Sequence, residues 1–249
     1  MSTDPIWENS HEPDVPLIED IAPGTANDPE AGSTETATVT IDGQTVETEP
    51  GTTLLDACET VDTDGEILAI CSYDENEKIG PRSECRTCMV ETEEHGIVPS
   101  CSFPAEDGMT VKTGTEGPTE ARDVNLDLLL SDHNLLCTTC GQNGRCDLQD
   151  ASIQNDVVDP RYGVFHDRDE LEPIDDSSPF IQIDRNKCIL CNRCVEACND
   201  VQVEGVLRME GSGPDTRIGF QNDADTMMGS TCVSCGHCAT VCPTGALVE

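Results

Sequence analysis

Two short stretches of the chain each carry four cysteines at the same spacing. Residues 187–200 read KCILCNRCVEACND and residues 232–243 read CVSCGHCATVCP. CxxC pairs occur six times in the chain, among them 85/88 and 137/140. A disulfide between two cysteines so close in sequence would remove little chain entropy from the unfolded state. Thiolates are, however, good ligands for zinc and for iron–sulfur clusters, and the spacing therefore predicts metal centres.

The third cysteine of each run favours an iron–sulfur cluster over zinc. Two CxxC pairs suffice for a tetrahedral zinc site, whereas CxxCxxC wraps the backbone around a larger body. In the pattern C-x2-C-x2-C-x3-C-P of two-cluster ferredoxins, the fourth cysteine of each run binds the other run's cluster. The first run has Asn199 in place of the proline, and the second keeps Pro243. We expect two [4Fe–4S] clusters with the ligand sets Cys188, Cys191, Cys194, Cys242 and Cys232, Cys235, Cys238, Cys198.

A third cluster is predicted in SDHNLLCTTCGQNGRCDLQ, residues 131–149. The segment offers only three thiolates, Cys137, Cys140 and Cys146, and His133 stands four residues before the first. A histidine on a leucine-rich helix face is usually a hydrogen-bonded core residue, and Leu129 and Leu136 suggest such a face for His133. Three thiolates leave one ligand position open, however, and imidazole is a competent metal donor. We expect His133 to be the fourth ligand of a [4Fe–4S] cluster.

Upstream of these segments, the pattern changes to strands and a helix. Residues 36–49 alternate apolar and polar side chains around Asp42-Gly43, which predicts a hairpin with a tight turn. Residues 52–61 show helical spacing, with Cys58 on the apolar face as a small core residue.

The order strand, turn, strand, helix and cysteine loop resembles the β-grasp fold of plant-type ferredoxins. This resemblance implies one [2Fe–2S] cluster, although the loop spacing departs from the plant pattern C-x4-C-x2-C. Arg86 would place a positive charge near the cluster. The implied ligands are Cys71, Cys85, Cys88 and Cys101.

The composition restricts the cellular environment in which the chain can be stable and the kinds of partner that it can bind. Its 249 residues include 13 Lys plus Arg and 50 Asp plus Glu, a formal charge of −37, and only 3% aromatic residues. Self-repulsion of this size is screened when molar salt shortens the Debye length from about 10 Å to about 3 Å, which predicts a cytoplasmic protein of a halophile with high internal salt. The charge also argues against a nucleic acid partner and therefore against a zinc-binding interaction module, the alternative from another class.

The N-terminal sequence has acids and prolines where a signal peptide would have a basic start and an apolar run. No window approaches the roughly 18 apolar residues of a transmembrane segment. We expect residues 1–35 to be an acidic, disordered tail, with Trp7 and Ile18 available to a partner.

Together, these motifs resemble the N-terminal electron-transfer region of the large peripheral subunit of respiratory complex I. The region is shared with the diaphorase subunit of NAD-linked hydrogenases and with NAD-linked formate dehydrogenases, and the resemblance covers residues 36–249. It implies an α+β chain with a β-grasp [2Fe–2S] domain (36–115), a His-Cys [4Fe–4S] segment (116–156), a linker (157–179) and a two-cluster domain (180–249). Tyr162, Val164 and Phe165 of the linker are expected to pack against a neighbouring module.

The resemblance implies an electron-transfer subunit of an oxidoreductase complex with no substrate site of its own. The cysteine segments look most similar to the formate dehydrogenase branch, in which the chain usually continues into a molybdopterin domain, whereas this sequence stops at Glu249. We therefore expect a separate molybdopterin catalytic subunit and an NAD- or quinone-linked electron-accepting subunit. A hydrogenase diaphorase or a complex I-type subunit is the alternative.

Overall fold

The computed structural model describes residues 36–73, 75–76, 78–162 and 171–249, and residues 35–249 form one compact unit. The predicted tail with Trp7 and Ile18 lies outside the described residues, as do Val164 and Phe165. No helix in the described ranges is both long and apolar enough to cross a membrane.

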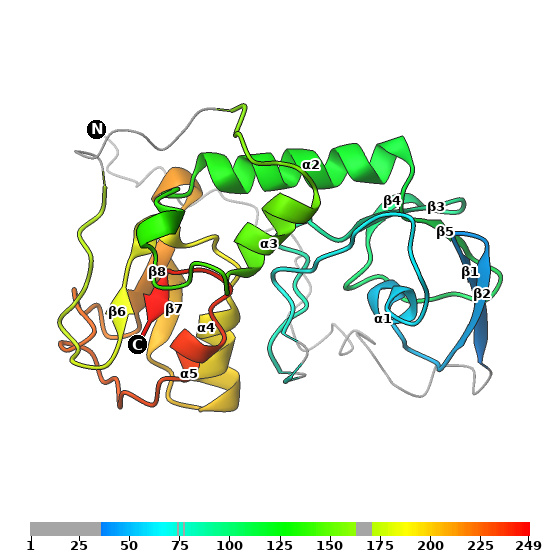
Figure 1. Cartoon of the computed structure of the whole chain (residues 1–249). Helices are drawn as coiled ribbons and strands as arrows, with labels where there is room; N and C mark the ends of the chain where they lie inside the picture. Colours follow the sequence, from blue (N-terminus) through cyan, green and yellow to red (C-terminus); the bar gives the residue numbers. More distant parts are fainter. Residues whose placement is uncertain (1–35, 74, 77, 163–170) are drawn as a thin grey trace, which may run out of the picture. The chain divides into compact units, whose positions relative to one another are not determined.

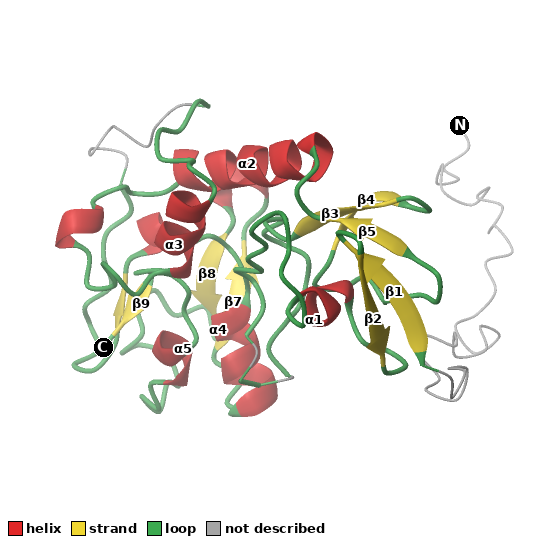
Figure 2. Cartoon of the chain, turned by 45° about the vertical axis from the view of Figure 1, so that its right-hand side comes forward, coloured by secondary structure: helices red, strands yellow, loops and turns green. Residues whose placement is uncertain are grey.

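The N-terminal part is built on a mixed sheet in the order β2-β1-β5-β3-β4 (Figure 2). β1 pairs parallel with β5, and the other neighbours pair antiparallel. Asp42 (φ 45°) and Gly43 (φ 81°) both adopt the left-handed conformation that a tight hairpin turn requires, which confirms the predicted hairpin. The strands are β1 (Ala37–Ile41), β2 (Gln44–Thr48), β3 (Met89–Thr92), β4 (Gly96–Pro99) and β5 (Thr110–Lys112).

Helix α1 (Leu54–Cys58) covers this sheet and confirms the predicted helical segment (Figure 1). Thr53 caps it, because its side chain accepts from the Asp56 amide while the Asp56 carboxylate accepts from the Thr53 amide. Cys58 is buried in the same core as the sheet residues Val39 and Ile41, as expected.

Helix α2 (Glu116–Ser131) is fastened to the sheet by a buried arginine. Arg122 donates to the carbonyls of Met89 in β3 and Thr113, which directly follows β5. The helix ends at Ser131, with Asp132 as its C-cap, so the expected helical face around His133 is wrong: His133 lies beyond the helix and Leu136 is exposed. Ser, Asp and Asn side chains compete for backbone hydrogen bonds, which accounts for a helix end within the Ser-Asp-His-Asn sequence.

A short turn and a third helix follow α2. They are η2 (Cys137–Thr139) and α3 (Asp147–Gln154), and α3 begins at the residue after Cys146. The cysteines of this segment therefore lie in η2 and in the loop that leads into α3.

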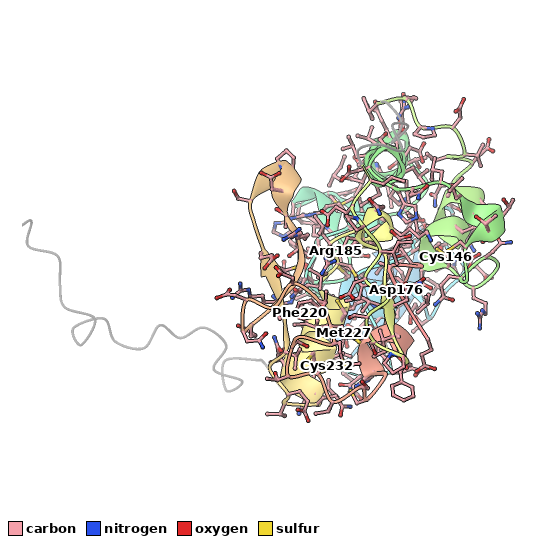
Figure 3. The ribbon with its side chains drawn as sticks, turned by 90° about the vertical axis from the view of Figure 1, so that its left-hand side faces the viewer. Cys146, Asp176, Arg185, Phe220, Met227 and Cys232 are labelled. Atoms are coloured by element: carbon pink, nitrogen blue, oxygen red, sulfur yellow. The ribbon has the colours of Figure 1, made fainter. Side chains whose placement is uncertain are left out.

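The C-terminal part consists of two small ribbons and short helices. Its core includes Phe220 and Met227, and the Arg185 guanidinium lies 6.0 Å from the Phe220 ring centroid (Figure 3). The ribbons are formed by β6 (Gln182–Ile183) with β9 (Leu247–Val248) and by β7 (Leu207–Glu210) with β8 (Arg217–Phe220). The helices are η4 (Arg185–Lys187), α4 (Arg193–Glu196), the π-helical turn η5 (Ala197–Val201), η6 (Gly213–Asp215) and α5 (His237–Thr240).

Candidate metal centres

The four thiols expected to hold the [2Fe–2S] cluster lie close together in one buried site, between the sheet and the loop that precedes β3. The Sγ atoms of Cys71 and Cys85 are 3.5 Å apart. Cys101 is within hydrogen-bonding reach of both Cys71 and Cys88. All four side chains are buried, so the fold brings this predicted set together and shields it from water.

Hydrogen bonds among these thiols favour negative charge on part of the set. Thiols of Cys101 and Cys85 donate to Cys71 and hold the pKa of Cys71 far below its usual range. A hydrogen bond from Cys101 likewise lowers the pKa of Cys88 to about 7. Thr87 adds a hydroxyl 3.1 Å from the Cys85 sulfur. The same hydrogen bonds raise the pKa values of the donors Cys85 and Cys101, so the charge is unevenly shared within the set. Thiolate, the form that binds metal, is thus favoured at Cys71 and Cys88 only.

Arg86, between Cys85 and Thr87, has a left-handed backbone (φ 56°) and an exposed side chain. Its carbonyl accepts a hydrogen bond from the Asn125 side chain of α2, 3.3 Å away. The expected electrostatic role of Arg86 stays a prediction.

The His-Cys segment surrounds a small cavity, which is lined by His133, Cys137, Cys140 and Cys146. His133 is only 6% exposed, and its Nδ1 atom is buried without a hydrogen-bond partner. Burial, helped by the charge of Lys187, lowers the pKa of His133 to about 4. The imidazole is therefore neutral at pH 7, which is the form that can coordinate a metal.

In each C-terminal cysteine run, the fourth cysteine lies near the leading cysteines of the other run. Burial, together with the charge of the nearby Cys242, raises the pKa of Cys188 to about 11. Cys191 and Cys194 also have pKa values raised by burial and then by the charge of Cys242. Cys242 of the second run thus lies with the three leading cysteines of the first.

The second set forms in the same way around Cys238. Burial, together with the charges of Cys232, Cys235 and Cys198, raises its pKa to about 12. Cys198 comes from the first run and lies in η5, where Asn199 donates to the Leu207 carbonyl. The structure therefore brings together both C-terminal ligand sets that the sequence predicts.

The two runs also share one backbone conformation. Leu190 (φ 56°) and Ser234 (φ 58°) occupy equivalent positions, and each donates its amide to the first sulfur of its run, Cys188 or Cys232. The residues after the second cysteines, Asn192 and Gly236, are left-handed as well and begin α4 and α5. This repeat turns successive thiols of each run toward one side.

One apolar core connects three of the four ligand sets. It contains Cys71 and Cys85 of the first set and Cys191 of a C-terminal set, and Cys146 of the His-Cys set packs against it. The remaining members come from the cysteine loop, α2 and α3: Ile70, Leu126, Leu130, Leu148 and Ala151.

The His-Cys segment also contacts the C-terminal part through its backbone. The Asp147 amide donates to the Pro243 carbonyl (2.9 Å), and the Asn134 amide donates to the Asn186 carbonyl (2.9 Å). A Cβ atom at Gly245 would lie 2.4 Å from the Cys140 sulfur, so only glycine allows this approach.

Comparison with known families separates the chain into three matched regions. Residues 34–116 match the 2Fe-2S iron-sulfur cluster binding domain. Residues 122–161 match the iron-sulfur binding region of NADH-ubiquinone oxidoreductase-G, and residues 187–246 match the 4Fe-4S dicluster domain. The chain thus carries the iron–sulfur region that formate dehydrogenases, G-type NADH–ubiquinone oxidoreductase subunits and NAD-reducing hydrogenase subunits share.

Individual relatives of the chain are named as proteins of the same kinds. The chain is 39% identical over 219 residues to the NADP-reducing hydrogenase subunit HndD of Solidesulfovibrio fructosivorans, covering 85% of this chain and 36% of that protein. It is also 39% identical over 215 residues to a Staphylococcus aureus (strain USA300) protein named provisionally as a formate dehydrogenase, covering 85% of this chain and 20% of that protein. The chain thus spans about a third or less of these relatives.

A solved structure shows the same arrangement of the chain. The crystal structure of an NAD+-reducing [NiFe]-hydrogenase in the H2-reduced state superposes with a TM-score of 0.75 at 28% identity. The match covers 85% of this chain and 86% of the hydrogenase chain.

The three matched domains account for one [2Fe–2S] and three [4Fe–4S] clusters. The predicted α+β fold, with a β-grasp domain, a His-Cys segment and a two-cluster domain, is confirmed. The chain is an iron–sulfur electron-transfer region related to formate dehydrogenase and hydrogenase subunits.

The residues of this chain fit those clusters. His133, whose Nδ1 is buried without a partner, lines a cavity together with three cysteines, and Gly245 leaves room beside Cys140. All sixteen cysteines are free thiols. Within the described ranges, no three His, Cys, Asp or Glu side chains are arranged to hold a single metal ion. The family matches are what favour iron–sulfur clusters over zinc.

The sequence did not predict that two charged residues of α4 would be buried and would join separate segments. Arg193 contacts Ile70 and Asp147, and Glu196 contacts Gly80 and pairs with Arg82. The only sequence signal was a pair of charged residues inside a cysteine run, where a metal site alone does not require them.

Proposed function

We propose that the chain carries electrons between a molybdopterin-type formate dehydrogenase centre and an NAD- or quinone-linked acceptor. The observation that supports a continuous electron path is the shared core, in which cysteines of three ligand sets lie in one packed cluster. The cysteine segments resemble the formate dehydrogenase branch, and a relative with that name is 39% identical.

We assign the ligands as the sequence predicts. Bound clusters would supply one-electron storage, while the chain holds them, orders them and excludes water from the sulfurs. The assigned sets are Cys71, Cys85, Cys88, Cys101 for the [2Fe–2S] cluster; His133, Cys137, Cys140, Cys146 for one [4Fe–4S] cluster; Cys188, Cys191, Cys194, Cys242 for another; and Cys198, Cys232, Cys235, Cys238 for the third.

Metal analysis tests this assignment. Protein purified without oxygen should contain about 14 irons per chain and little zinc. Stoichiometric zinc with little iron would refute the cluster assignment, including the path built on it.

A hydrogenase partner is the second candidate, supported by the hydrogenase relative and by the superposed hydrogenase structure. The two candidates differ in the electron donor that reduces the clusters. We would isolate the tagged chain with its native partners, add formate, H2 or NADH without oxygen, and follow the visible absorbance. Bleaching by formate but not by H2 is the expected result, whereas bleaching by H2 alone would favour the hydrogenase.

A further inference from the structure

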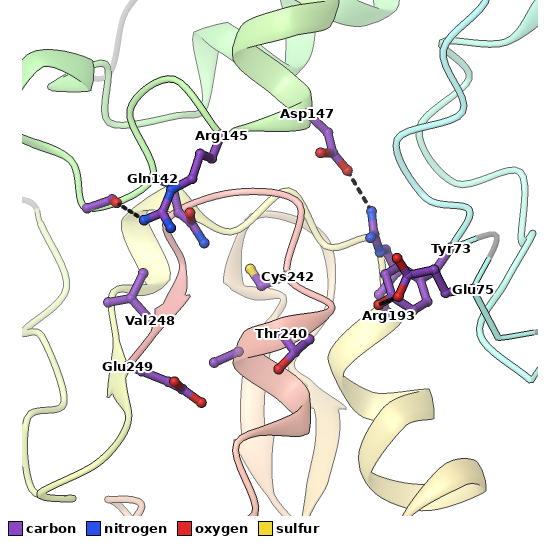
Figure 4. A pocket seen from close by; sticks show the side chains of 12 residues that line it. Tyr73, Glu75, Gln142, Arg145, Asp147, Arg193, Thr240, Cys242, Val248 and Glu249 are labelled. Atoms are coloured by element: carbon purple, nitrogen blue, oxygen red, sulfur yellow. Dashed lines mark hydrogen bonds and ion pairs between the residues drawn. The ribbon is translucent and has the colours of Figure 1, made fainter.

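Arg193 lies at the point where three cluster-binding segments meet. Its side chain is almost fully buried, and residue exposure is 5%. The Nη1 atom donates to the Ile70 carbonyl (3.0 Å) and to the Asp147 carboxylate (2.8 Å). The guanidinium also lies 4.9 Å from the centroid of the Tyr73 ring. Figure 4 shows the pair with Asp147 and the adjacent Tyr73.

The two hydrogen-bonded partners of Arg193 are each next to a ligand of a different set. Ile70 directly precedes Cys71, and Asp147 directly follows Cys146. Arg193 itself lies between Cys191 and Cys194 in the first C-terminal run. A single side chain therefore touches the immediate neighbours of the [2Fe–2S] and His-Cys sets while belonging to a third set.

Glu196, three residues later in α4, strengthens the same junction. Its carboxylate accepts from the Gly80 amide (2.8 Å) and pairs with Arg82, both in the loop that carries Cys71 and Cys85. Two buried side chains of opposite charge thus fasten α4 to that loop. Of these two side chains, Arg193 contacts the His-Cys segment as well.

We propose that Arg193 is a positioning residue for electron transfer: it fixes the three ligand sets relative to one another and keeps a permanent positive charge between them. This inference rests on the proposed function. An electron that passes between two sets oxidises one cluster and reduces the next, so the step needs no further reactant. Arginine remains charged in proteins, and a positive charge beside a cluster favours its reduced, more negative form.

The planar guanidinium explains why arginine stands here. It can donate to a carbonyl and a carboxylate while its face lies against an aromatic ring. A lysine would keep the charge but not this combination of contacts. Arg193→Lys therefore separates the charge from the positioning, whereas Arg193→Gln removes both.

The experiment compares these two variants with Arg208→Gln in the full chain. Arg208 is an arginine of the same C-terminal part, and its ion pairs with Glu210 and Asp223 stay within its own ribbon and the turn after it. For each protein we would measure iron content, the midpoint potential of each cluster, and the rate at which the clusters share an electron after pulse reduction.

Both Arg193 variants should keep about 14 irons and share the electron about tenfold more slowly or worse, because small displacements of reacting centres have large effects on rate. Arg193→Gln should also lower at least one midpoint potential, while Arg193→Lys and Arg208→Gln should leave the potentials unchanged.

Rates and potentials in Arg193→Gln that equal those of Arg208→Gln would overturn the inference. Loss of clusters in Arg193→Lys would overturn it too, since a positioning residue leaves the ligands able to assemble. Asp147→Asn keeps the arginine and weakens only one contact, so it should slow electron sharing if Arg193→Gln fails to fold. Wild-type protein without iron would instead refute the proposed function.

Discussion

At the scale of single residues, His133 distinguishes a mixed ligand set from an ordinary buried histidine. Its Nδ1 atom is buried without a partner, and burial keeps the imidazole neutral at pH 7. A neutral imidazole in place of a thiolate leaves the cluster one unit less negative, so its potential should be higher than with four thiolates.

We therefore predict that His133→Cys retains the cluster and lowers its potential, whereas His133→Ala leaves one iron exposed and labile. Anaerobic redox titration followed by electron paramagnetic resonance measures both effects. Four unaltered cluster signals in His133→Ala would remove His133 from the ligand set.

Cys58 provides the opposite case, a buried thiol with a structural role. Burial, with the charges of Asp42 and Glu59, raises its pKa to about 12, so the thiol stays neutral below that pH. We predict that Cys58→Ala keeps all the iron and lowers stability by about 1 kcal/mol, because only a small core side chain is lost.

Cys85→Ala is the matched control for Cys58→Ala, since both cysteines are buried in the N-terminal part. It should reduce the iron content by about two per chain through loss of the [2Fe–2S] cluster. Equal iron loss in both variants would contradict the assigned difference between them.

At the scale of elements, the attachment of α2 depends on Arg122. Arg122→Met should remove the side-chain donor to the part-buried Met89 carbonyl and the buried Thr113 carbonyl and lower stability by about 3 kcal/mol. Lys112→Met on the exposed part of β5 is the control and should change stability by less than about 0.5 kcal/mol. Thermal unfolding at high salt, followed by circular dichroism, compares the two; equal midpoints would show that Arg122 does not fasten α2.

Local sequence signals predicted the elements whose geometry is fixed by neighbouring residues. The Asp42-Gly43 hairpin follows from turn chemistry, and α1 follows from the helical spacing of residues 52–61. The end of α2 before His133 was not predicted, because leucine spacing continues past the Ser-Asp-His-Asn sequence that stops the helix. The π-helical turn η5 around Cys198 had no local signal either.

At the scale of the whole molecule, the acidic composition predicts a requirement for salt. Of the 249 residues, 50 are Asp or Glu, and the formal charge is −37. Dialysis from molar KCl into dilute buffer should therefore cost tertiary structure and bleach the visible absorbance, since screening falls as the Debye length rises. Sucrose in dilute buffer is a control without ions and should not protect. Unchanged circular dichroism and absorbance at low salt would contradict a halophilic protein.

The cysteine spacing predicted the grouping of ligand candidates, including the exchange of Cys198 and Cys242 between runs, because each run repeats one backbone geometry. The junction between segments could not be predicted in this way. Arg193 reaches Ile70 across 123 positions and Asp147 across 46, and no periodicity relates residues so far apart. Only the fold shows that these positions meet.

The central claim is that this chain stores and passes electrons through four clusters, and an anaerobic reductive titration tests it most directly. The purified chain in molar KCl would be titrated with a strong one-electron reductant while its absorbance and paramagnetic signals are recorded. One [2Fe–2S] and three [4Fe–4S] clusters should take up about four electrons per chain, with four distinguishable signals. A colourless, zinc-containing chain that accepts no electrons would contradict the account.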